Sequence, residues 1–159
     1  MARILIVGGG CRGLGLARSL RGDGHAVRVT TRTERGRAAI ERSGAECWIG
    51  TPDRIASLRY ALENVTLVCW LLGNASGERA HELHGSRLEF MLSQTIDTTA
   101  RGVVYEAAGR IDGAVLSAGA ELVAERARYN EIPFALLDCD PADETAWFER
   151  ARAAIDALL

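Results

Sequence analysis

Length, composition and charge indicate an ordinary globular domain. The chain has 159 residues, of which 48% are hydrophobic and 25% charged, with a formal net charge of −2. We therefore expect a single domain over residues 1–159 with no separate substrate domain, and no nucleic-acid partner. All 19 basic residues are arginine. The absence of lysine excludes a P-loop nucleotide site and Schiff-base catalysis.

The spacing of the cysteines indicates whether a metal or redox motif is present, and the length of the hydrophobic runs indicates whether the chain enters a membrane. None of Cys11, Cys47, Cys69 and Cys139 forms a C-x-x-C pair, so a zinc ribbon or a thioredoxin-like motif is not indicated. The N-terminus runs directly into an apolar stretch with no signal sequence, and no apolar run is long enough to span a bilayer. We expect a cytoplasmic protein with no membrane partner.

Short apolar runs alternate with helical patterns along the whole chain. The runs read as buried strands at 4–7, 27–31, 47–49, 67–72, 103–105 and 134–137. Apolar residues recur at helical spacing in 55–62, 88–96 and 147–158. Thr51-Pro52-Asp53 and Asp140-Pro141-Ala142-Asp143 are typical helix starts, with a capping residue followed by proline. This alternation predicts an α/β fold: a doubly wound, parallel Rossmann sheet of about six strands in the order 3-2-1-4-5-6, with helices on both faces.

A glycine-rich loop follows the first expected strand and precedes a helix. Gly8, Gly10 and Gly13 match the pattern G-x-G-x-x-G. Such glycines permit a tight turn, close approach to a pyrophosphate and close helix packing, and the helix start attracts an anion. The loop therefore predicts a dinucleotide site; the alternative is a glycine-rich turn that holds no ligand. The cofactor-binding residues expected here are Gly8, Gly10, Cys11, Arg12, Gly13 and Leu14.

The same region resembles the short-chain dehydrogenase/reductase family. Gly9, Gly13 and Gly15 fit that family's G-x-x-x-G-x-G loop, and residues 3–35 resemble its atypical, epimerase-like branch. The resemblance continues through the turn at 50–58 and covers essentially the whole chain. It implies an NAD(P)-binding Rossmann fold but no particular reaction.

The end of the second expected strand bears on which dinucleotide binds. NAD sites usually place an acid there, on the ribose 2′-hydroxyl. This chain has Thr30, Thr31 and Arg32, and Arg32 suits bidentate pairing with a 2′-phosphate. The resemblance adds Arg12, because NADP-preferring members often carry a basic residue at that place, and Arg35 could add charge. We expect NADP, with NAD as the alternative. Further cofactor contacts are expected at Thr31, Asp53, Leu72 and Gly73.

The family's usual catalytic pair is absent. Carbonyl-reducing members use Tyr-x-x-x-Lys, and this chain has no lysine. Any chemistry must come from loops at the carboxyl ends of the strands. Candidates by position are Asn74, Ser76, His81, His84 and Glu106, of which we take Asn74, His81 and His84 as the candidate catalytic residues. The histidines are read as proton donors or, alternatively, as solvated loop residues. They lack a third ligand, so no metal site is expected.

The connection 73–85 is long for a Rossmann unit. Its glycines, Gly73, Gly77 and Gly85, would allow it to move, so we expect a lid against the nicotinamide. The alternative is an insertion that does not contact the ligand. The nicotinamide end would lie against this loop and the turn after Glu106, on the side of the fourth and fifth strands.

Two classes of function remain open from the sequence. The first is a non-catalytic module that binds NADP and reports its redox state, which the missing catalytic pair favours. The second is a small NADPH-dependent oxidoreductase whose loop residues donate protons, which the long loop favours. The expected partner is a nicotinamide dinucleotide, and either a homodimer or another protein partner remains open.

Overall fold

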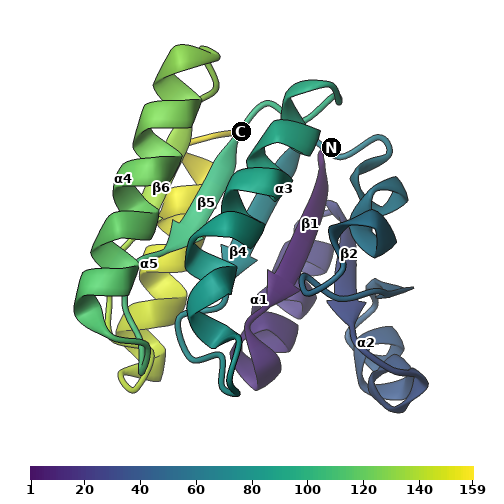
Figure 1. The fold of residues 1–159 in the computed structure, drawn as a ribbon. Helices are drawn as coiled ribbons and strands as arrows, with labels where there is room; N and C mark the ends of the chain where they lie inside the picture. Colours follow the sequence, from purple (N-terminus) through teal and green to yellow (C-terminus); the bar gives the residue numbers. More distant parts are fainter.

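The strands form one parallel sheet in the expected order. The computed structural model describes residues 1–159. Its six strands lie in the order β3-β2-β1-β4-β5-β6, and every neighbouring pair is parallel. The predicted doubly wound sheet is therefore confirmed (Figure 1). The strands are β1 (Arg3–Gly8), β2 (Ala26–Thr31), β3 (Glu46–Ile49), β4 (Leu67–Leu71), β5 (Val103–Glu106) and β6 (Phe134–Leu137).

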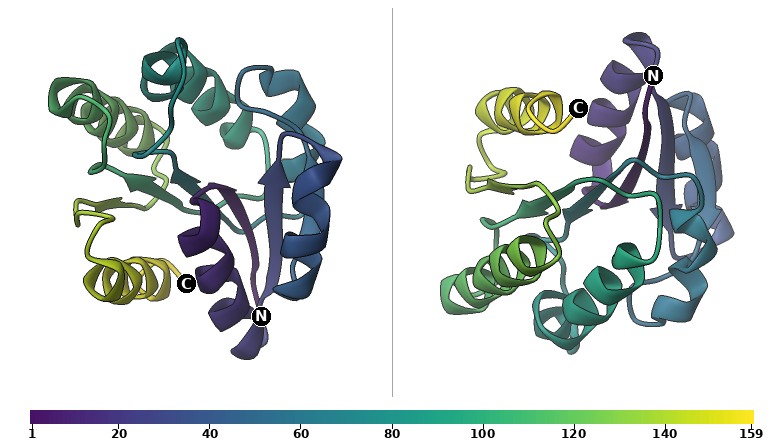
Figure 2. Two further views of the ribbon diagram at one scale, coloured as in Figure 1. Left: turned by 90° about the horizontal axis from the view of Figure 1, so that it is seen from below. Right: turned by 90° about the horizontal axis from the view of Figure 1, so that it is seen from above.

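Helices cover both faces of the sheet. In the end views of Figure 2, α1 and α5 lie against one face and α3 and α4 against the other. The helices are α1 (Gly10–Gly22), α2 (Arg37–Arg42), α3 (Ser86–Ile96), α4 (Gly113–Tyr129) and α5 (Glu144–Asp156). No helix is both long enough and apolar enough to cross a membrane.

The sheet divides the core into two layers. Successive side chains of β1 alternate between them: Leu5 and Val7 pack with α3 and α4, whereas Ile4 and Ile6 pack with α1 and α5. All four side chains are fully buried. A strand that is buried on both faces must be apolar throughout, which explains why β1 reads as a continuous apolar run.

The segment between β3 and β4 differs from the prediction. We expected a helix at 55–62, and the structure has two short 3-10 turns, η2 (Ile55–Leu58) and η3 (Tyr60–Leu62). Side chains from the strands donate hydrogen bonds to backbone carbonyls that would accept backbone hydrogen bonds in an α-helix. The indole Nε1 of Trp48 donates to the Ser57 carbonyl at 2.8 Å, and the Arg28 guanidinium donates to the Ala61 carbonyl. The capping residues Thr51 to Asp53 therefore start no α-helix.

The start of α5 also lies later than its sequence signal suggests. Asp140 accepts a hydrogen bond from the N–H of Ala142 at 2.9 Å, which closes a local turn. The helix is capped instead by Asp143, whose carboxylate accepts from the N–H of Ala146 at 3.1 Å. The predicted helix start at Asp140 was wrong. Asp140 and Asp143 can both act as capping residues, but Asp140 caps only a turn and Asp143 caps the helix.

Candidate nucleotide-binding site

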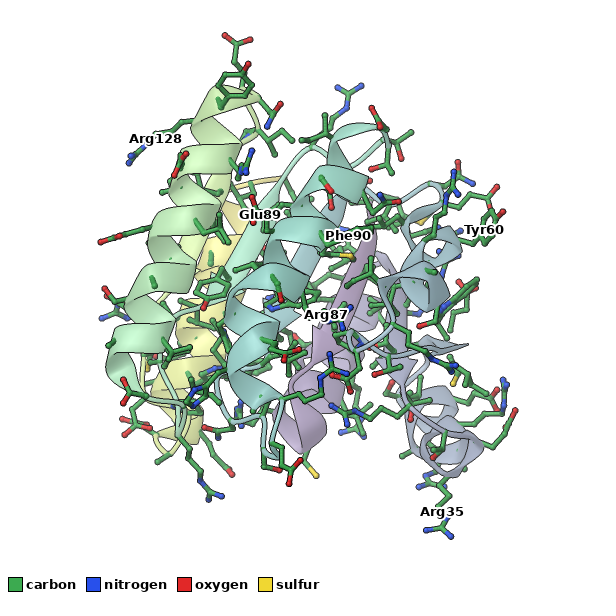
Figure 3. The ribbon with its side chains drawn as sticks, viewed as in Figure 1. Arg35, Tyr60, Arg87, Glu89, Phe90 and Arg128 are labelled. Carbon is green, nitrogen blue, oxygen red and sulfur yellow. The ribbon has the colours of Figure 1, made fainter.

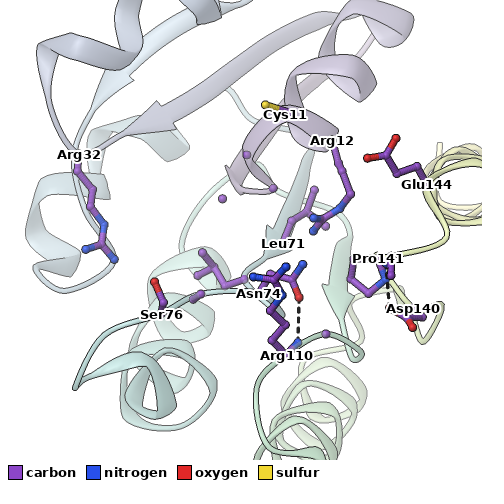
Figure 4. A pocket seen from close by; sticks show the side chains of 17 residues that line it. Cys11, Arg12, Arg32, Leu71, Asn74, Ser76, Arg110, Asp140, Pro141 and Glu144 are labelled. Carbon is purple, nitrogen blue, oxygen red and sulfur yellow. Dashed lines mark hydrogen bonds between the residues drawn. The ribbon is translucent and has the colours of Figure 1, made fainter.

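A cleft of about 830 Å³ opens at the carboxyl edge of the sheet. The glycine loop and the first residues of α1 form one side of it, and Arg32 lies at its far end beyond β2 (Figure 4). The end of β4, the turn after β5 and the segment before α5 form the rest. Open α/β sheets bind their ligands at this edge, between β1 and β4.

Two glycines of the loop are required by packing. Gly8 has φ +83°, and a Cβ there would overlap the Leu71 carbonyl. A Cβ on Gly13 would lie 2.9 Å from the Gly8 carbonyl oxygen, so Gly13 lets α1 approach β1 closely. Both positions need glycine whether or not a ligand binds.

Gly10 differs from these two glycines. It has φ +52°, no atom lies within 4 Å of a Cβ built on it, and it lines the cleft. A side chain at Gly10 would therefore project into empty space within the cleft. Loops of this kind leave such an open glycine face so that a pyrophosphate can approach the backbone, and we refer to the open face of Gly10 as the cradle.

The start of α1 offers hydrogen-bond donors beside this cradle. The first N–H in the helix with a backbone acceptor is that of Gly13, which donates to the Gly9 carbonyl at 2.9 Å. The earlier N–H groups, of Gly10, Cys11 and Arg12, precede the helical hydrogen-bond ladder. No acidic residue lies in the first turn, so the positive end of the helix dipole is not neutralised there.

Arg12 faces away from β2. Its Nη2 lies 3.2 Å from the carboxylate of Glu106, and its guanidinium stacks 4.9 Å from the ring centre of Trp147. Figure 4 shows Arg12 and Arg32 on opposite sides of the cleft. The role that we expected for Arg12, pairing with a 2′-phosphate at the end of β2, is therefore corrected: its charge is held by a buried carboxylate at the end of β5.

Glu106 joins four parts of the fold. It is fully buried, and its carboxylate accepts from the N–H of Gly73 at 2.8 Å and from Nε1 of Trp147 at 2.7 Å. Together with Arg12, these donors surround the carboxylate, as a buried charge requires. Glu106 thus acts as a structural anchor that ties α1, β4, β5 and α5 together, and it does not line the cleft.

Arg32 follows directly after β2. It lines the cleft, its side chain is 58% exposed, and its only ion pair is with Asp53 at 3.5 Å. An exposed pair of this kind contributes little free energy and can exchange partners. The carboxylate of Glu34, two residues further on, accepts two hydrogen bonds from Arg37, which lower its pKa, and it forms no ion pair with Arg32. Arg35 projects into solvent beyond the cleft (Figure 3).

His84 is a core residue. It is buried, its Nε2 lies 2.9 Å from the Leu72 carbonyl and its Nδ1 lies 2.7 Å from the Tyr105 hydroxyl. A carbonyl only accepts, so Nε2 carries the proton and Nδ1 accepts from Tyr105. Burial lowers the pKa of His84, which favours this neutral form. The expected role of His84 as a proton donor in the cleft is therefore wrong, and His81 is exposed and lies outside the cleft.

The connection 73–85 is fixed to the core over much of its length. Residues 80–84 form the 3-10 turn η4, with Ala80 and Leu83 buried, and Nε1 of Trp70 donates to the Leu83 carbonyl at 2.9 Å. Only Asn74, Ala75 and Ser76 of this connection line the cleft. The lid expected across 73–85 is therefore corrected for residues 80–84, which pack into the core and do not cover the cleft, whereas residues 74–76 form part of its wall.

The predicted site residues divide into two sets. Those that line the cleft are Gly8, Gly10, Cys11, Arg12, Arg32, Leu72 and Asn74. Those that do not are Gly13, Leu14, Thr31, Arg35, Asp53, Gly73, His81 and His84. Gly109 and Arg110 line the cleft from the turn after Glu106, a turn that was expected near the nicotinamide although neither residue was named. The lining residues Asp140, Pro141, Ala142 and Glu144 were not expected at the site. The signal that could have found them is their position just after β5 and β6, at the carboxyl edge where ligands bind.

Comparisons with known proteins support the fold. No family model matches the chain, and no curated protein matches it in sequence. Among solved structures, BdcA from E. coli aligns with a TM-score of 0.73 at 12% identity, over 96% of this chain and 89% of that one. The Citrobacter sp. triphenylmethane reductase complexed with NADP(H) aligns with a TM-score of 0.64 at 18% identity, over 85% of this chain and 48% of that one.

A third solved structure, the UDP-glucose 4-epimerase from Thermotoga maritima, aligns with a TM-score of 0.66 at 12% identity, over 84% of this chain and 54% of that one. The chain spans about half the length of such reductases and epimerases. At these identities the likeness is one of fold, and it confirms the Rossmann fold that the sequence predicted.

Proposed function

We propose that this chain binds NADP in the cleft and acts as a non-catalytic binding module or redox sensor. The open face of Gly10, beside the acid-free start of α1, carries the proposal. A pyrophosphate there would accept hydrogen bonds from the free N–H groups of α1 and would be favoured by the helix dipole. The nicotinamide ring of such a cofactor accepts or donates a hydride.

The choice of NADP over NAD rests on the end of β2. Arg32 lines the cleft, and the only carboxylate paired with it is the partly exposed Asp53 at 3.5 Å. A 2′-phosphate would offer a stronger, bidentate partner than Asp53 does. The triphenylmethane reductase with the same fold was solved with NADP(H), which is consistent with this choice.

The positions of the ionisable side chains favour a binding module over an enzyme. Neither His81 nor His84 lines the cleft, and the Tyr105 hydroxyl is buried against His84. Burial raises the pKa of Tyr105 above its usual value, so this tyrosine is a poor proton donor to a substrate. The residues that carry proton chemistry in the wider family therefore have no equivalent in the cleft.

A small NADPH-dependent oxidoreductase is the second candidate. The observation that favours it is the polar wall of Asn74 and Arg110, which lies at the end of the cleft where the nicotinamide would sit. Such a wall could orient a substrate against the cofactor. Steady-state oxidation of NADPH with a panel of quinones, aldehydes and flavins distinguishes the two candidates, because only an enzyme turns over.

Binding calorimetry tests the proposal. The purified chain is titrated with NADP, NADPH, NAD and NADH under identical conditions. We expect one site per chain and tighter binding of the two phosphorylated nucleotides. A sensor is further expected to bind NADP and NADPH with different affinities. No heat of binding with any of the four would overturn the proposal.

A further inference from the structure

We propose that Asn74 and Arg110 form a binding point for the carboxylate or phosphate group of a second ligand, at the end of the cleft away from Arg32. The inference rests on the proposed function, because it assigns the glycine loop and the end of β2 to the dinucleotide. Beyond the dinucleotide, the inference names the chemical class of a second molecule that binds beside it.

The first observation concerns the charge of Arg110. Three arginines line the cleft. Arg12 pairs with Glu106, and Arg32 pairs with Asp53. Arg110 is exposed and belongs to no ion pair, and Figure 4 shows its side chain in the cleft beside Asn74. It is the one guanidinium of the cleft whose charge no carboxylate of the chain offsets.

The second observation concerns the orientation of Asn74. Its Oδ1 accepts a hydrogen bond from the backbone N–H of Arg110 at 2.9 Å, and only the oxygen of an amide side chain can accept. The Nδ2 group is therefore turned away from that backbone, and it donates to no group of the chain. The Nδ2 group of Asn74 and the guanidinium of Arg110 together present several N–H donors, a set that suits a carboxylate or a phosphate.

The third observation is that the backbone fixes this pair of donors. The N–H of Ile111 donates to the Gly73 carbonyl at 3.0 Å, and a Cβ on either Gly73 or Gly109 would overlap the backbone of the other loop. The loops after β4 and β5 are therefore in direct contact. A site held in place before binding loses less conformational entropy when its ligand arrives.

The opposite wall narrows the class of ligand. Asp140 and Glu144 line the cleft near the start of α5 and form no ion pair with Arg110. Asp140 already caps the N–H of Ala142. Asp140, on the wall nearest Arg110, disfavours a second negative group at this end of the cleft, so the ligand that fits there has a single anionic end and a neutral or cationic remainder.

A titration monitored by NMR tests the inference. The full chain, saturated with NADP, is titrated with propionate, with its neutral counterpart propionamide, and with inorganic phosphate. We expect saturable shifts of the Asn74 side-chain amide and the Arg110 Nε–H signals with an anion and not with propionamide. The tighter of propionate and phosphate identifies the carboxylate or the phosphate as the preferred group.

Two variants separate this site from the dinucleotide site. Arg110→Gln is expected to abolish the shift at Asn74 and to leave NADP affinity unchanged. Arg18→Gln is the matched control, because Arg18 is an exposed arginine of α1 outside the cleft, and it should leave both unchanged.

Three results would overturn the inference: shifts that do not saturate, equal shifts with propionamide, or weaker NADP binding by Arg110→Gln, which would assign Arg110 to the dinucleotide itself. Failure of the proposed function is seen separately, as no NADP binding by the wild-type chain. The anions are then titrated into the free protein, where an unchanged Asn74 signal overturns the second site as well.

Discussion

The two ends of the cleft are built in different ways. At one end, the cradle comes from backbone conformation within a few consecutive residues, Gly8 to Gly13. At the other end, the wall is supported from behind by the buried carboxylate of Glu106 in β5, which does not line the cleft and which α1, α5 and the segment after β4 all contact. Affinity for the dinucleotide therefore depends mainly on the glycine loop, whereas the stability of the site depends mainly on Glu106. Mutations should therefore affect one without the other.

The largest expected effect is at the cradle. Gly10→Val places a side chain where the pyrophosphate would lie, so we expect loss of detectable NADP binding in calorimetry. Gly24→Val is the matched control, since Gly24 also has positive φ and open space around its Cβ but lies outside the cleft. Both variants carry the backbone cost of a branched residue at positive φ. Equal NADP affinity in the two variants would show that Gly10 is not the cradle.

The next effect concerns the stability of the far wall. Glu106→Ala leaves Arg12, Trp147 and the N–H of Gly73 without their acceptor. Breaking a buried charged cluster of this kind costs about 3–5 kcal/mol. Urea unfolding measures the change, with Trp147→Phe as the comparison, which removes one hydrogen bond to a charged group, about 1.5–3 kcal/mol, together with some packing. A Glu106→Ala protein as stable as the wild type would contradict the anchoring role.

A smaller effect is expected at the end of β2. Arg32→Ala should weaken NADP binding by about 1.5–3 kcal/mol, the range of a hydrogen bond to a charged group, and should leave NAD binding nearly unchanged. Arg35→Ala is the control, because Arg35 lies outside the cleft. If Arg32→Ala weakens both nucleotides equally, the assignment of the 2′-phosphate to Arg32 is wrong.

The smallest effect is a pH dependence from His84. Burial lowers the pKa of His84 in the folded chain, so below about pH 6.5 the unfolded chain binds a proton that the folded chain does not. Stability should fall as pH drops from 7 to 5, by at most about 1.4 kcal/mol per pH unit. His84→Gln should reduce this slope in urea unfolding, and His81→Gln, at an exposed position, should not. Equal slopes in the two variants would contradict the buried neutral histidine.

The same contrast explains what could be predicted from the sequence. The glycine loop is contiguous, so its pattern revealed Gly8, Gly10 and Gly13 directly. The contact between Glu106 and Trp147 joins residues 41 positions apart, and that between Asn74 and Arg110 joins residues 36 apart. Nothing in the local pattern signals such pairs. The side chain of Arg12 points toward Glu106, which is distant in the sequence, so its orientation could not be predicted from the local pattern.

The helices show a similar limit. The apolar spacing of 88–96 predicted α3 within two residues, whereas α4, the longest helix, was not singled out. Its buried positions include Gly119 and Ala127 alongside Leu116 and Val123. Gly119 faces the Tyr105 hydroxyl so closely that a Cβ would overlap it. Close packing on a buried tyrosine thus selected small residues, which weaken the apolar pattern by which a helix is predicted.

Amide hydrogen exchange with and without NADP tests the central claim, that a dinucleotide binds in this cleft along the glycine loop and the end of β2. The account predicts slower exchange on binding in residues 8–13 and near Arg32. It predicts little change in residues 80–84, which pack into the core and lie outside the cleft. Unchanged exchange across residues 8–13 in the presence of saturating NADP would contradict the claim.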